Sequence, residues 1–528
     1  MLTAILFIPL LAALAILFIP RDFRPIIRGV ALLSTLLTAF LAVVLFLKFD
    51  SDFRPAADYV KQHGQFQFAQ LLEWLPALGL NYHVGVDGLN IGLILMGAIV
   101  AFAAVCVSWE IKTQEKEFYL LLLVMAGGIL GAFASLNLFF FYAFHEFALV
   151  PTFIMIGVWG RGENRNAATF NITMYLSLGA LIALFGLIAL YLQLPAVMPD
   201  GAPRSFDIVP VTEYFKSNPM AVSAQQFIFP LLLFGFGILV SLWPFHTWAP
   251  LGYGAAPTAT AMLHAGVLKK FGLYGLLRVA LPLMPVGARS WMQILALLCL
   301  GNILYCGWVA MRQRDLNQLI GNSSVAHMGF AFLGIASLTL IGVTGTVLVM
   351  VAHGFLAALT FGLSGYLRAH AGTLNMDELG GLLRKAPFIG AALIMAMLAG
   401  CGLPGFANFA GEITVLFGTW KSGLHGAWQF AAAAAWGALI IGAVYMLRAV
   451  RNVMHGESKG PGIPDATAWR KAPFVLLLAA LLLFGVFPGL LAVKIRPDAE
   501  RLVKLATGQG MPDKARPIKL NTASLAKP

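Results

Sequence analysis

The 528-residue chain is strongly apolar: 59% of its residues are hydrophobic, 11% are charged, and its mean hydropathy is +0.83. Soluble domains carry about 25% charged residues, so this composition excludes an ordinary soluble enzyme and indicates that lipid is the main solvent. The net charge of +12 does not indicate a nucleic-acid partner, because the basic residues lie in short loops and in the C-terminal tail.

Long apolar runs follow one another along the whole chain, and a helical membrane span needs about 20 such residues. No run alternates with the two-residue period of a barrel strand. We therefore predict an all-α integral membrane protein of about fourteen transmembrane helices. The predicted spans cover 2–19, 28–47, 88–108, 118–135, 137–158, 168–194, 226–246, 256–278, 291–311, 319–340, 343–367, 387–415, 427–448 and 472–493.

The first apolar run could be a signal peptide, but it lacks a basic start and a small-residue cleavage site, so we expect a retained helix. Lys and Arg are roughly twice as frequent in loops after odd-numbered spans as in loops after even-numbered spans. Arg278, at the end of the eighth span, is counted among the residues of the even-numbered loops. This bias predicts cytoplasmic odd loops, both termini outside, and a multi-pass protein of the bacterial inner (plasma) membrane. The polar, basic tail from Lys494 onward is expected to be loosely ordered or docked on a neighbour.

Two spans contain proline and glycine where a helix should break. The seventh ends in SLWPFHTWAP, residues 241–250, and the twelfth contains GCGLPGFANFAGE, residues 400–412. Two broken helices five spans apart are typical of inverted-repeat transporters, whereas ordinary proline kinks between packed helices are the alternative. The predicted division is 1–117 for helices 1–3 with an outer loop, 118–280 and 281–450 for two inverted five-helix repeats, and 451–528 for a linker, helix 14 and the tail.

Two acidic residues lie inside predicted spans. Glu146 follows His145 in FFFYAFHEFALV, and Glu412 ends the broken stretch of the twelfth span. Charge at membrane depth is costly, so such carboxylates usually face the protein interior and mark ion or proton paths. For Glu146 the alternative is a structural hydrogen bond to a neighbouring helix, and for Glu412 it is a cap on the second half-helix.

Basic residues also lie inside spans. Lys269 and Lys270 are adjacent in HAGVLKKFGLYG, and successive helical residues point about 100° apart, so the two should meet different surroundings. Snorkelling to the membrane surface is the alternative for both. Histidine titrates near neutral pH and suits a proton relay, although a lone helical histidine is often only a hydrogen-bonded core residue. The candidate histidines are His327 and His353, followed by the weaker His246 and His264.

The chain carries no motif for a cofactor or a metal. Its four cysteines form no CxxC pair, and it has no GxGxxG on a strand, no Walker loop and no zinc spacing. We therefore predict no cofactor-binding and no metal residues, and any electron-transfer centre must belong to another protein.

Several sequence blocks resemble a known family. The strings PFHTWAP, APTATAMLHAGVLKKFGLYGLLR, MRQRDLNQLIGNSSVAHMGF, AHGFLAALTFGLSGYL and GLPGFANFAGE are similar to the antiporter-like membrane subunits of respiratory complex I (NADH:quinone oxidoreductase). These subunits belong to the proton-conducting/Mrp-antiporter superfamily. The strings look most like its NuoM type, the bacterial counterpart of mitochondrial ND-four. The matching blocks run from about residue 118 to 415.

The resemblance implies a proton-translocating subunit of an oxidoreductase without redox chemistry of its own. FMN, iron–sulphur clusters and quinone are expected in partner subunits, and the expected neighbours are other complex I membrane subunits, including antiporter-like ones and a long lateral helix, as well as lipids. By motif, Glu146 resembles the family's fifth-helix glutamate, Lys270 its eighth-helix lysine, His327 and His353 its central relay, and Glu412 its twelfth-helix residue near the exit.

One position departs from the family pattern. The family usually has a lysine seven residues before the histidine of the P-x-H-x-W string, and here that position is Leu239. In the family this lysine pairs with the fifth-helix glutamate, so Glu146 would lack its counter-ion. The additional Lys269 could supply a replacement, provided that it lies close to Glu146.

Two other interpretations stay open from the sequence. The same half-channels would serve in a Mrp-type cation/proton antiporter, a membrane-bound hydrogenase or an inorganic-carbon-uptake complex. The missing lysine could alternatively leave a non-pumping scaffold.

Overall fold

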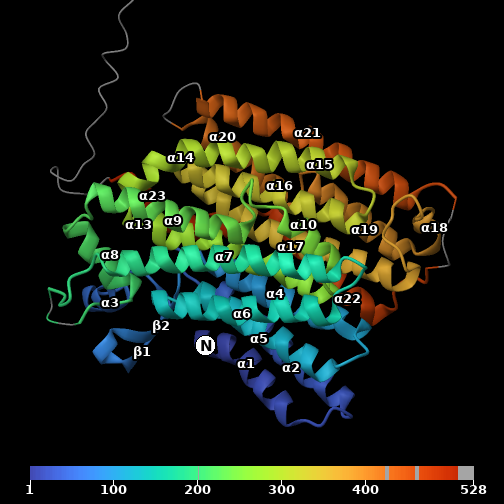
Figure 1. The fold of residues 1–528 in the computed structure, drawn as a ribbon, viewed down its shortest axis with the longest axis horizontal. Helices are drawn as coiled ribbons and strands as arrows, with labels where there is room; N and C mark the ends of the chain where they lie inside the picture. The colour runs from blue at the N-terminus through green and yellow to red at the C-terminus, as the bar shows by residue number, and fades with distance from the viewer. Residues whose placement is uncertain (200, 202, 423–426, 458–462, 509–528) are drawn as a thin grey trace, which may run out of the picture.

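The computed structural model describes residues 1–199, 201, 203–422, 427–457 and 463–508. These residues form a wide helical bundle with α1 and α2 at one edge and α21 at the other (Figure 1). The long helices are α1 (Leu2–Phe18), α2 (Arg24–Lys48), α4 (Ile91–Val107), α5 (Glu115–Ala134), α6 (Leu138–Trp159), α7 (Arg165–Tyr191), α9 (Val222–Val240), α14 (Pro285–Leu300), α16 (Leu316–Ala336), α17 (Leu340–Ala371), α19 (Pro387–Gly400), α20 (Ala407–Trp420), α21 (Ala427–Met454), α22 (Ala468–Val486) and α23 (Gly489–Ala506).

The expectation of a multi-pass membrane protein is confirmed. Within the described residues, 11 helices are long and apolar enough to cross a membrane, and α1 and α19 are shorter apolar helices. The count of about fourteen is not reproduced by this measure. The reason is that α1 is short, while the predicted eighth and twelfth spans are divided into several pieces.

Both predicted helix breaks are present. Helix α9 ends at Val240, Ser241 adopts a left-handed backbone conformation with φ of 71°, and the chain resumes as α10 (Trp248–Ala255). The second break separates α19 from α20 at residues 401–406, where Gly402 and Gly405 have positive φ. The predicted division into two inverted repeats, with its boundaries at 118, 281 and 451, stays a prediction.

The predicted eighth span is irregular. It consists of α11 (Thr258–Leu263), a π-helical segment η3 (His264–Leu268), α12 (Lys270–Gly275), a second π-helical segment η4 (Leu276–Ala280) and α13 (Leu281–Leu283). A third π-helical segment, η5 (Gly301–Cys306), joins α14 to α15 (Gly307–Arg312). Such widened turns often accompany functional positions, because they redirect side chains without ending the helix.

The loop between α2 and α4 contains structure that the sequence pattern did not predict. It holds a short helix α3 (Ala57–His63) and an antiparallel pair, β1 (Gln67–Leu75) and β2 (Leu80–Val86). The turn depends on Gly79, whose φ is +65° and whose missing side chain leaves room for the backbone oxygen of Arg204. A further short helix, α8 (Ile208–Ser217), lies at the same end of the bundle (Figure 1).

The expectation that the tail from Lys494 is loosely ordered is wrong for its described part, and docking on a neighbour stays a prediction. Residues 489–506 form α23, which packs against α17 and α13 of the same chain. The last predicted span is correspondingly shorter, because α22 ends at Val486 before Pro488. Residues beyond 508 lie outside the described part of the chain.

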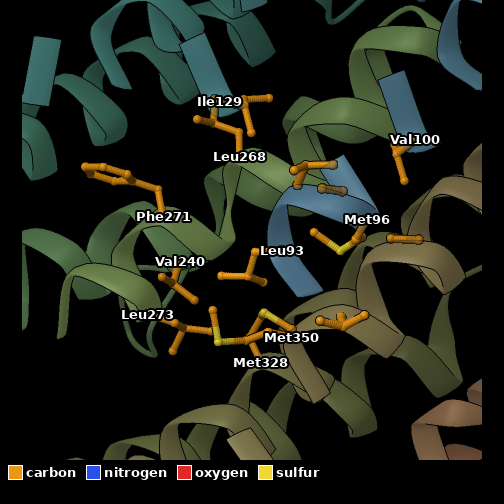
Figure 2. Packing of buried hydrophobic residues seen from close by; sticks show 14 of the residues in the cluster. Leu93, Met96, Val100, Ile129, Val240, Leu268, Phe271, Leu273, Met328 and Met350 are labelled. Atoms are coloured by element: carbon orange, nitrogen blue, oxygen red, sulfur yellow. The ribbon is translucent and has the colours of Figure 1, made fainter. Parts of the chain in front are cut away.

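The centre of the bundle is formed by α16 and α17, whose most apolar windows are fully buried inside the chain. Figure 2 shows the apolar packing around α12, with Leu93 and Met96 from α4, Met328 from α16 and Met350 from α17. Because lipid tails are as apolar as these side chains, the gain from this packing within the membrane is mainly van der Waals contact. The packing also keeps the ionisable residues described below apart from bulk solvent.

Candidate functional site

Lys269 and Lys270 lie directly after the π-helical segment η3. Both are buried, so neither snorkels to the membrane surface. The widened turn is closed by a hydrogen bond from the backbone N–H of Lys269 to the carbonyl of His264. The two side chains point to different helices, as their helical spacing predicts: Lys270 meets α17, and Lys269 meets α16.

Lys270 has two close partners. Its Nζ lies 2.6 Å from the carbonyl oxygen of Ala265 and 2.7 Å from Nδ1 of His353. The carbonyl is an acceptor only, so Lys270 donates to it, whereas the contact to His353 can carry a proton in either direction. Lys270 and His353 are therefore joined directly, with no gap for bulk water between them.

His353 leads to the second histidine. Its ring centroid is 5.7 Å from that of His327, which comes from the neighbouring helix α16. Nδ1 of His327 lies 2.7 Å from Oε1 of Glu412 on α20. The chain of buried groups thus runs from Lys270 through both histidines to Glu412, across α12, α17, α16 and α20.

Glu412 lies in the interior of α20, six positions after the N-cap residue Phe406. The alternative that Glu412 caps the second half-helix is therefore wrong. Its Oε2 has no hydrogen-bond partner among the described residues and lies near the broken segment, where a side chain at Gly402 would meet it at 2.9 Å. The glycine thus leaves room for the carboxylate at the break between α19 and α20.

A small cavity adjoins this end of the chain of groups. Its volume is about 20 Å³, enough for a single water molecule, and His327, Cys401 and Tyr445 contribute to its lining. Nε2 of His327 also lacks a partner among the described atoms. The site therefore combines unpaired buried polar atoms with space for a water molecule that could connect them.

Lys269 has a different environment. Its Nζ lies 3.3 Å from Oγ of Ser324 and 5.6 Å from the ring centre of Tyr253. The hydroxyl of Tyr253 contacts Nδ1 of His264 at 3.2 Å. His246, by contrast, lies in the broken segment, where its Nδ1 is 3.2 Å from the carbonyl oxygen of Pro244 and its ring packs against Tyr305.

Glu146 is less enclosed than the sequence suggests. Its side chain is 32% exposed on α6, and its partner in an ion pair among the described residues is His145, with Nδ1 3.6 Å from Oε1. His145 itself is buried and stacks on Phe271 with ring centroids 4.0 Å apart. Glu146 is therefore half-buried and not fully buried as expected, because its helix lies at the outer surface of the described chain at this point.

The hypothesis that Lys269 replaces the missing counter-ion of Glu146 fails. Lys269 is buried, but its contacts are with Ser324 and Tyr253 and not with Glu146. Leu239, at the position where the family has its lysine, is buried within the apolar packing of α9. No lysine or arginine forms an ion pair with Glu146 within the described residues.

Asn302 is a polar residue of the site region that sequence reasoning missed. Its Oδ1 accepts the backbone N–H of Trp243 at 2.7 Å, and its Nδ2 donates to the carbonyls of Ser241 at 2.8 Å and Val325 at 3.2 Å. Asn302 thus satisfies backbone groups that the break after α9 leaves free. A single asparagine inside an otherwise apolar span was the available signal.

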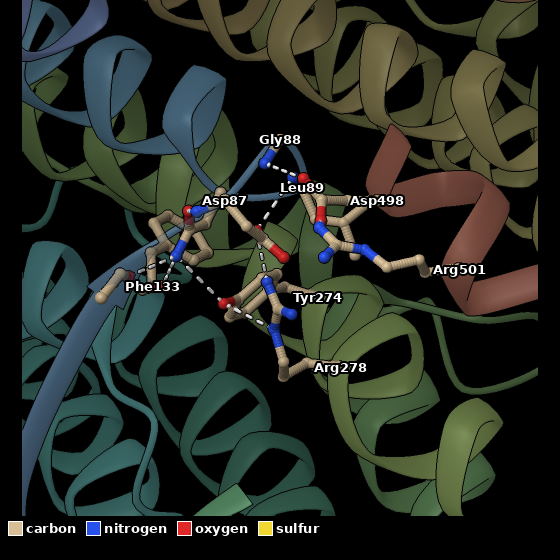
Figure 3. Close-up of polar contacts among 10 residues, drawn as sticks. Asp87, Gly88, Leu89, Phe133, Tyr274, Arg278, Asp498 and Arg501 are labelled. Carbon is tan, nitrogen blue, oxygen red and sulfur yellow. Dashed lines mark hydrogen bonds and ion pairs between the residues drawn. The ribbon is translucent and has the colours of Figure 1, made fainter. Parts of the chain in front are cut away.

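A second polar cluster, drawn in Figure 3, lies at the end of the bundle that carries α3, α8 and α23 (Figure 1). Arg278, counted above as a loop residue, is buried within η4, and its Nη2 lies 2.5 Å from Oδ1 of Asp87. Its Nε donates to the hydroxyl of Tyr274 at 3.0 Å. From α23, Asp498 accepts the backbone N–H of Gly88 at 2.7 Å and pairs with Arg501. A cavity of about 630 Å³ opens beside this cluster.

Comparison with known proteins places the chain in a family. The family model described as "NADH:quinone oxidoreductase/Mrp antiporter, TM" matches residues 135–449. The NADH-quinone oxidoreductase subunit M of Rickettsia conorii is 34% identical over 92% of this chain and 94% of its own length. The subunit of the same name from Rhodobacter capsulatus is 32% identical over 96% of each chain. The F(420)H(2) dehydrogenase subunit M of Methanosarcina mazei is 32% identical over 96% of this chain and 99% of its own length.

Solved structures agree. A chain of respiratory complex I from Thermus thermophilus superposes with a TM-score of 0.84 at 29% identity, covering 96% of this chain and 100% of that one. A chain of the Mrp complex from Dietzia shares the fold, with a TM-score of 0.78 at 18% identity over 96% and 98%. The chain is an integral membrane protein that belongs to the NADH:quinone oxidoreductase/Mrp antiporter family.

Proposed function

We propose that this chain is a proton-translocating membrane subunit of an NADH:quinone oxidoreductase, and that it moves protons along the buried groups Lys270, His353, His327 and Glu412. The relatives named subunit M and the complex I chain of similar fold support the assignment to this assembly. The observation that carries the mechanism is the continuity of the four groups, with two contacts of 2.7 Å separated by one pair of histidine rings.

The chemistry of the path is proton transfer alone. A charged Lys270 donates a proton to Nδ1 of His353 and becomes neutral. The proton passes to His327, through a water molecule where the rings are too far apart for a direct bond, and then to the carboxylate of Glu412. Glu412 then releases its proton toward one side of the membrane, and Lys270 takes up a proton from the other side. Each group thus returns to its starting state, so the energy must come from redox chemistry in other subunits.

The arrangement of the loops supports the proposed orientation, with both termini outside the bacterial inner membrane. Segments predicted to lie outside, including α3, α8 and α23, gather at one end of the bundle and share the lining of one cavity. Segments predicted to lie in the cytoplasm also meet one another. Arg161 pairs with Glu110, and Arg368 donates to the carbonyl of Gly254.

The proposed partners are other membrane subunits of the complex, including antiporter-like neighbours and a long lateral helix, together with lipids. Flavin, iron–sulphur clusters and quinone are assigned to partner subunits. The exposed apolar side chains on α2, α7 and α21 support this proposal, because they provide wide surfaces suited to lipid or to neighbouring helices.

The test is redox-driven proton uptake by the assembled complex in sealed vesicles, with NADH oxidation measured in parallel. Lys270→Met and Glu412→Gln should each lower proton uptake by about tenfold or more, because each removes a proton-carrying group from the path through His353 and His327. Leu268→Met, a buried neighbour of similar volume, serves as the control and should pump as the wild type does.

Wild-type proton uptake in an assembled Lys270→Met complex would overturn the proposal and favour a scaffold. Isolation of the chain in an assembly without flavin and iron–sulphur subunits would instead favour a Mrp-type antiporter or another related complex.

A further inference from the structure

We propose that Lys269 is a second proton-loading residue, whose arm through Tyr253, His264 and Ser324 joins the Lys270 arm at His327. This inference rests on the proposed function and extends it. It gives a role in proton transfer to Lys269 and the polar groups around it, which the path through Lys270 does not use.

The first argument is the direction of the side chains. Lys269 contacts Oγ of Ser324 at 3.3 Å, and His327 follows Ser324 by three positions on α16, so both project from the same face of that helix. Lys270 reaches the same histidine from the other side, through His353 on α17. Two adjacent lysines thus approach one histidine along two different helices.

The second argument is that Lys269 is poorly satisfied for a permanent charge. An ammonium group has three N–H donors, and the hydrogen-bond partner of Lys269 within the described residues is Ser324 alone. The ring of Tyr253 adds a cation–π contact at 5.6 Å. A buried ammonium group that never released its proton would need more partners than this.

The third argument is that no carboxylate compensates the charge of Lys269 within the described residues. The titratable groups that act on Lys269, or on which it acts, are His264 and His353, His246 in the broken segment, Cys306 of η5 and the adjacent Lys270. None of these is acidic in the way a carboxylate is. Charge on both lysines at once is therefore unfavourable, and a proton on one arm opposes loading of the other.

The fourth argument is a connection toward the end of the bundle assigned to the cytoplasm. Tyr253 belongs to α10, and its hydroxyl contacts Nδ1 of His264, whose Nε2 is buried without a partner in the described structure. The next residue, Gly254, also in α10, accepts a hydrogen bond at its carbonyl from Arg368 in the last turn of α17, at that end of the bundle. The tyrosine and histidine therefore extend the Lys269 arm from this end of the bundle toward Ser324.

The experiment compares Lys269→Met, Ser324→Ala and the double variant in the assembled complex, reconstituted in vesicles. We expect each single variant to lower proton uptake severalfold and to change the shape of its pH profile. The double variant should be no worse than Lys269→Met, because both changes cut the same arm. Lys269→Arg keeps the positive charge, but a guanidinium group does not release its proton, so this variant should not restore proton uptake.

The outcomes separate this inference from the proposed function. If Lys270→Met abolishes proton uptake while Lys269→Met keeps the wild-type rate and pH profile, the second arm is refuted and the main path stands. Restoration of wild-type uptake by Lys269→Arg would also refute it, since charge alone would then suffice. If the Lys269→Met complex fails to assemble, the Ser324→Ala and Tyr253→Phe variants decide. Wild-type proton uptake with an unchanged pH profile in both variants refutes the Lys269 arm. Loss of proton uptake in either variant supports it.

Discussion

The imidazole of His327 and the carboxylate of Glu412 form a buried pair, with Nδ1 2.7 Å from Oε1. The pair joins α16 to α20 directly beyond the break between α19 and α20. The remaining nitrogen of His327 and the second oxygen of Glu412 have no partner within the described structure. One nitrogen of His327 and one oxygen of Glu412 thus remain available to a further proton carrier, and the small cavity lined by His327 has room for a water molecule in that place.

Replacement of His327 tests the proposed relay at the residue that lies between His353 and Glu412. We expect His327→Gln to keep a hydrogen bond to Glu412 but to lower redox-driven proton uptake by about tenfold or more, because an amide cannot carry the proton. The measurement is proton uptake per NADH oxidised in vesicles. Retention of normal uptake would contradict the relay, and equal assembly of both complexes on a native gel controls for folding.

Asn302 should be a determinant of stability at the first break. Asn302→Ala removes three hydrogen bonds and leaves backbone groups of Ser241 and Trp243 unsatisfied, so we expect a loss of about 2–4 kcal/mol. The thermal midpoint of the purified protein measures the change. The matched control is Asn171→Ala on the surface of α7, where the asparagine only bonds its own helix, and it should change stability by less than about 0.5 kcal/mol.

The docking of α23 should depend on Asp498. Asp498→Ala leaves the N–H of Gly88 without its partner and should weaken the attachment of α23 by about 1–3 kcal/mol. We expect faster hydrogen exchange in residues 489–506. The control is Glu500→Ala, an exposed residue of the same helix whose ion pair within the described structure is with Lys504. The result would count against the interpretation if both variants exchanged alike.

A further prediction concerns pH outside the membrane spans. Burial raises the pKa of Asp207 from an ordinary 3.8 to about 6, although Asn81 and Asn137 donate to its carboxylate. Burial, with the nearby His63, lowers the pKa of His83 from 6.5 to about 4. Nδ1 of His83 lies 3.9 Å from Oδ1 of Asp207, so the two groups share one environment.

The two shifts act in opposite directions on stability. The contribution of Asp207 is present below pH 4 and is lost as the pH rises to about 6, because the folded state holds the proton longer than the unfolded state. The contribution of His83 is present above pH 6.5 and is lost as the pH falls to about 4. Each amounts to about 3 kcal/mol, so they largely cancel in the native protein.

Single substitutions should therefore reveal the hidden pH dependence. The thermal midpoint of Asp207→Asn should rise between pH 4 and 6.5, whereas that of His83→Gln should fall over the same range. The wild-type midpoint should change less than either. Parallel pH profiles in all three proteins would show that this pair does not titrate as described.

The sequence alone was sufficient for the membrane class, the family and the places where two helices break. Apolar runs, loop charges, and proline with glycine are local features, and their physical effect in lipid does not depend on distant parts of the chain. Lys270, His327, His353 and Glu412 could be named as candidates for the same reason, since a charge inside an apolar run is costly wherever the run packs.

Only the tertiary structure decided which of these candidates meet. Lys269 and Lys270 are neighbours in sequence, yet the widened turn of η3 and the placement of α16 and α17 send them to Ser324 and His353. Helices distant in sequence likewise determine that Glu146 is half-exposed and that Asn302 bonds the backbone of Ser241. They also determine that Asp498 of α23 accepts the N–H of Gly88. A local pattern determines that a polar group is costly in the membrane, but only the packing of remote helices determines which partner reduces that cost.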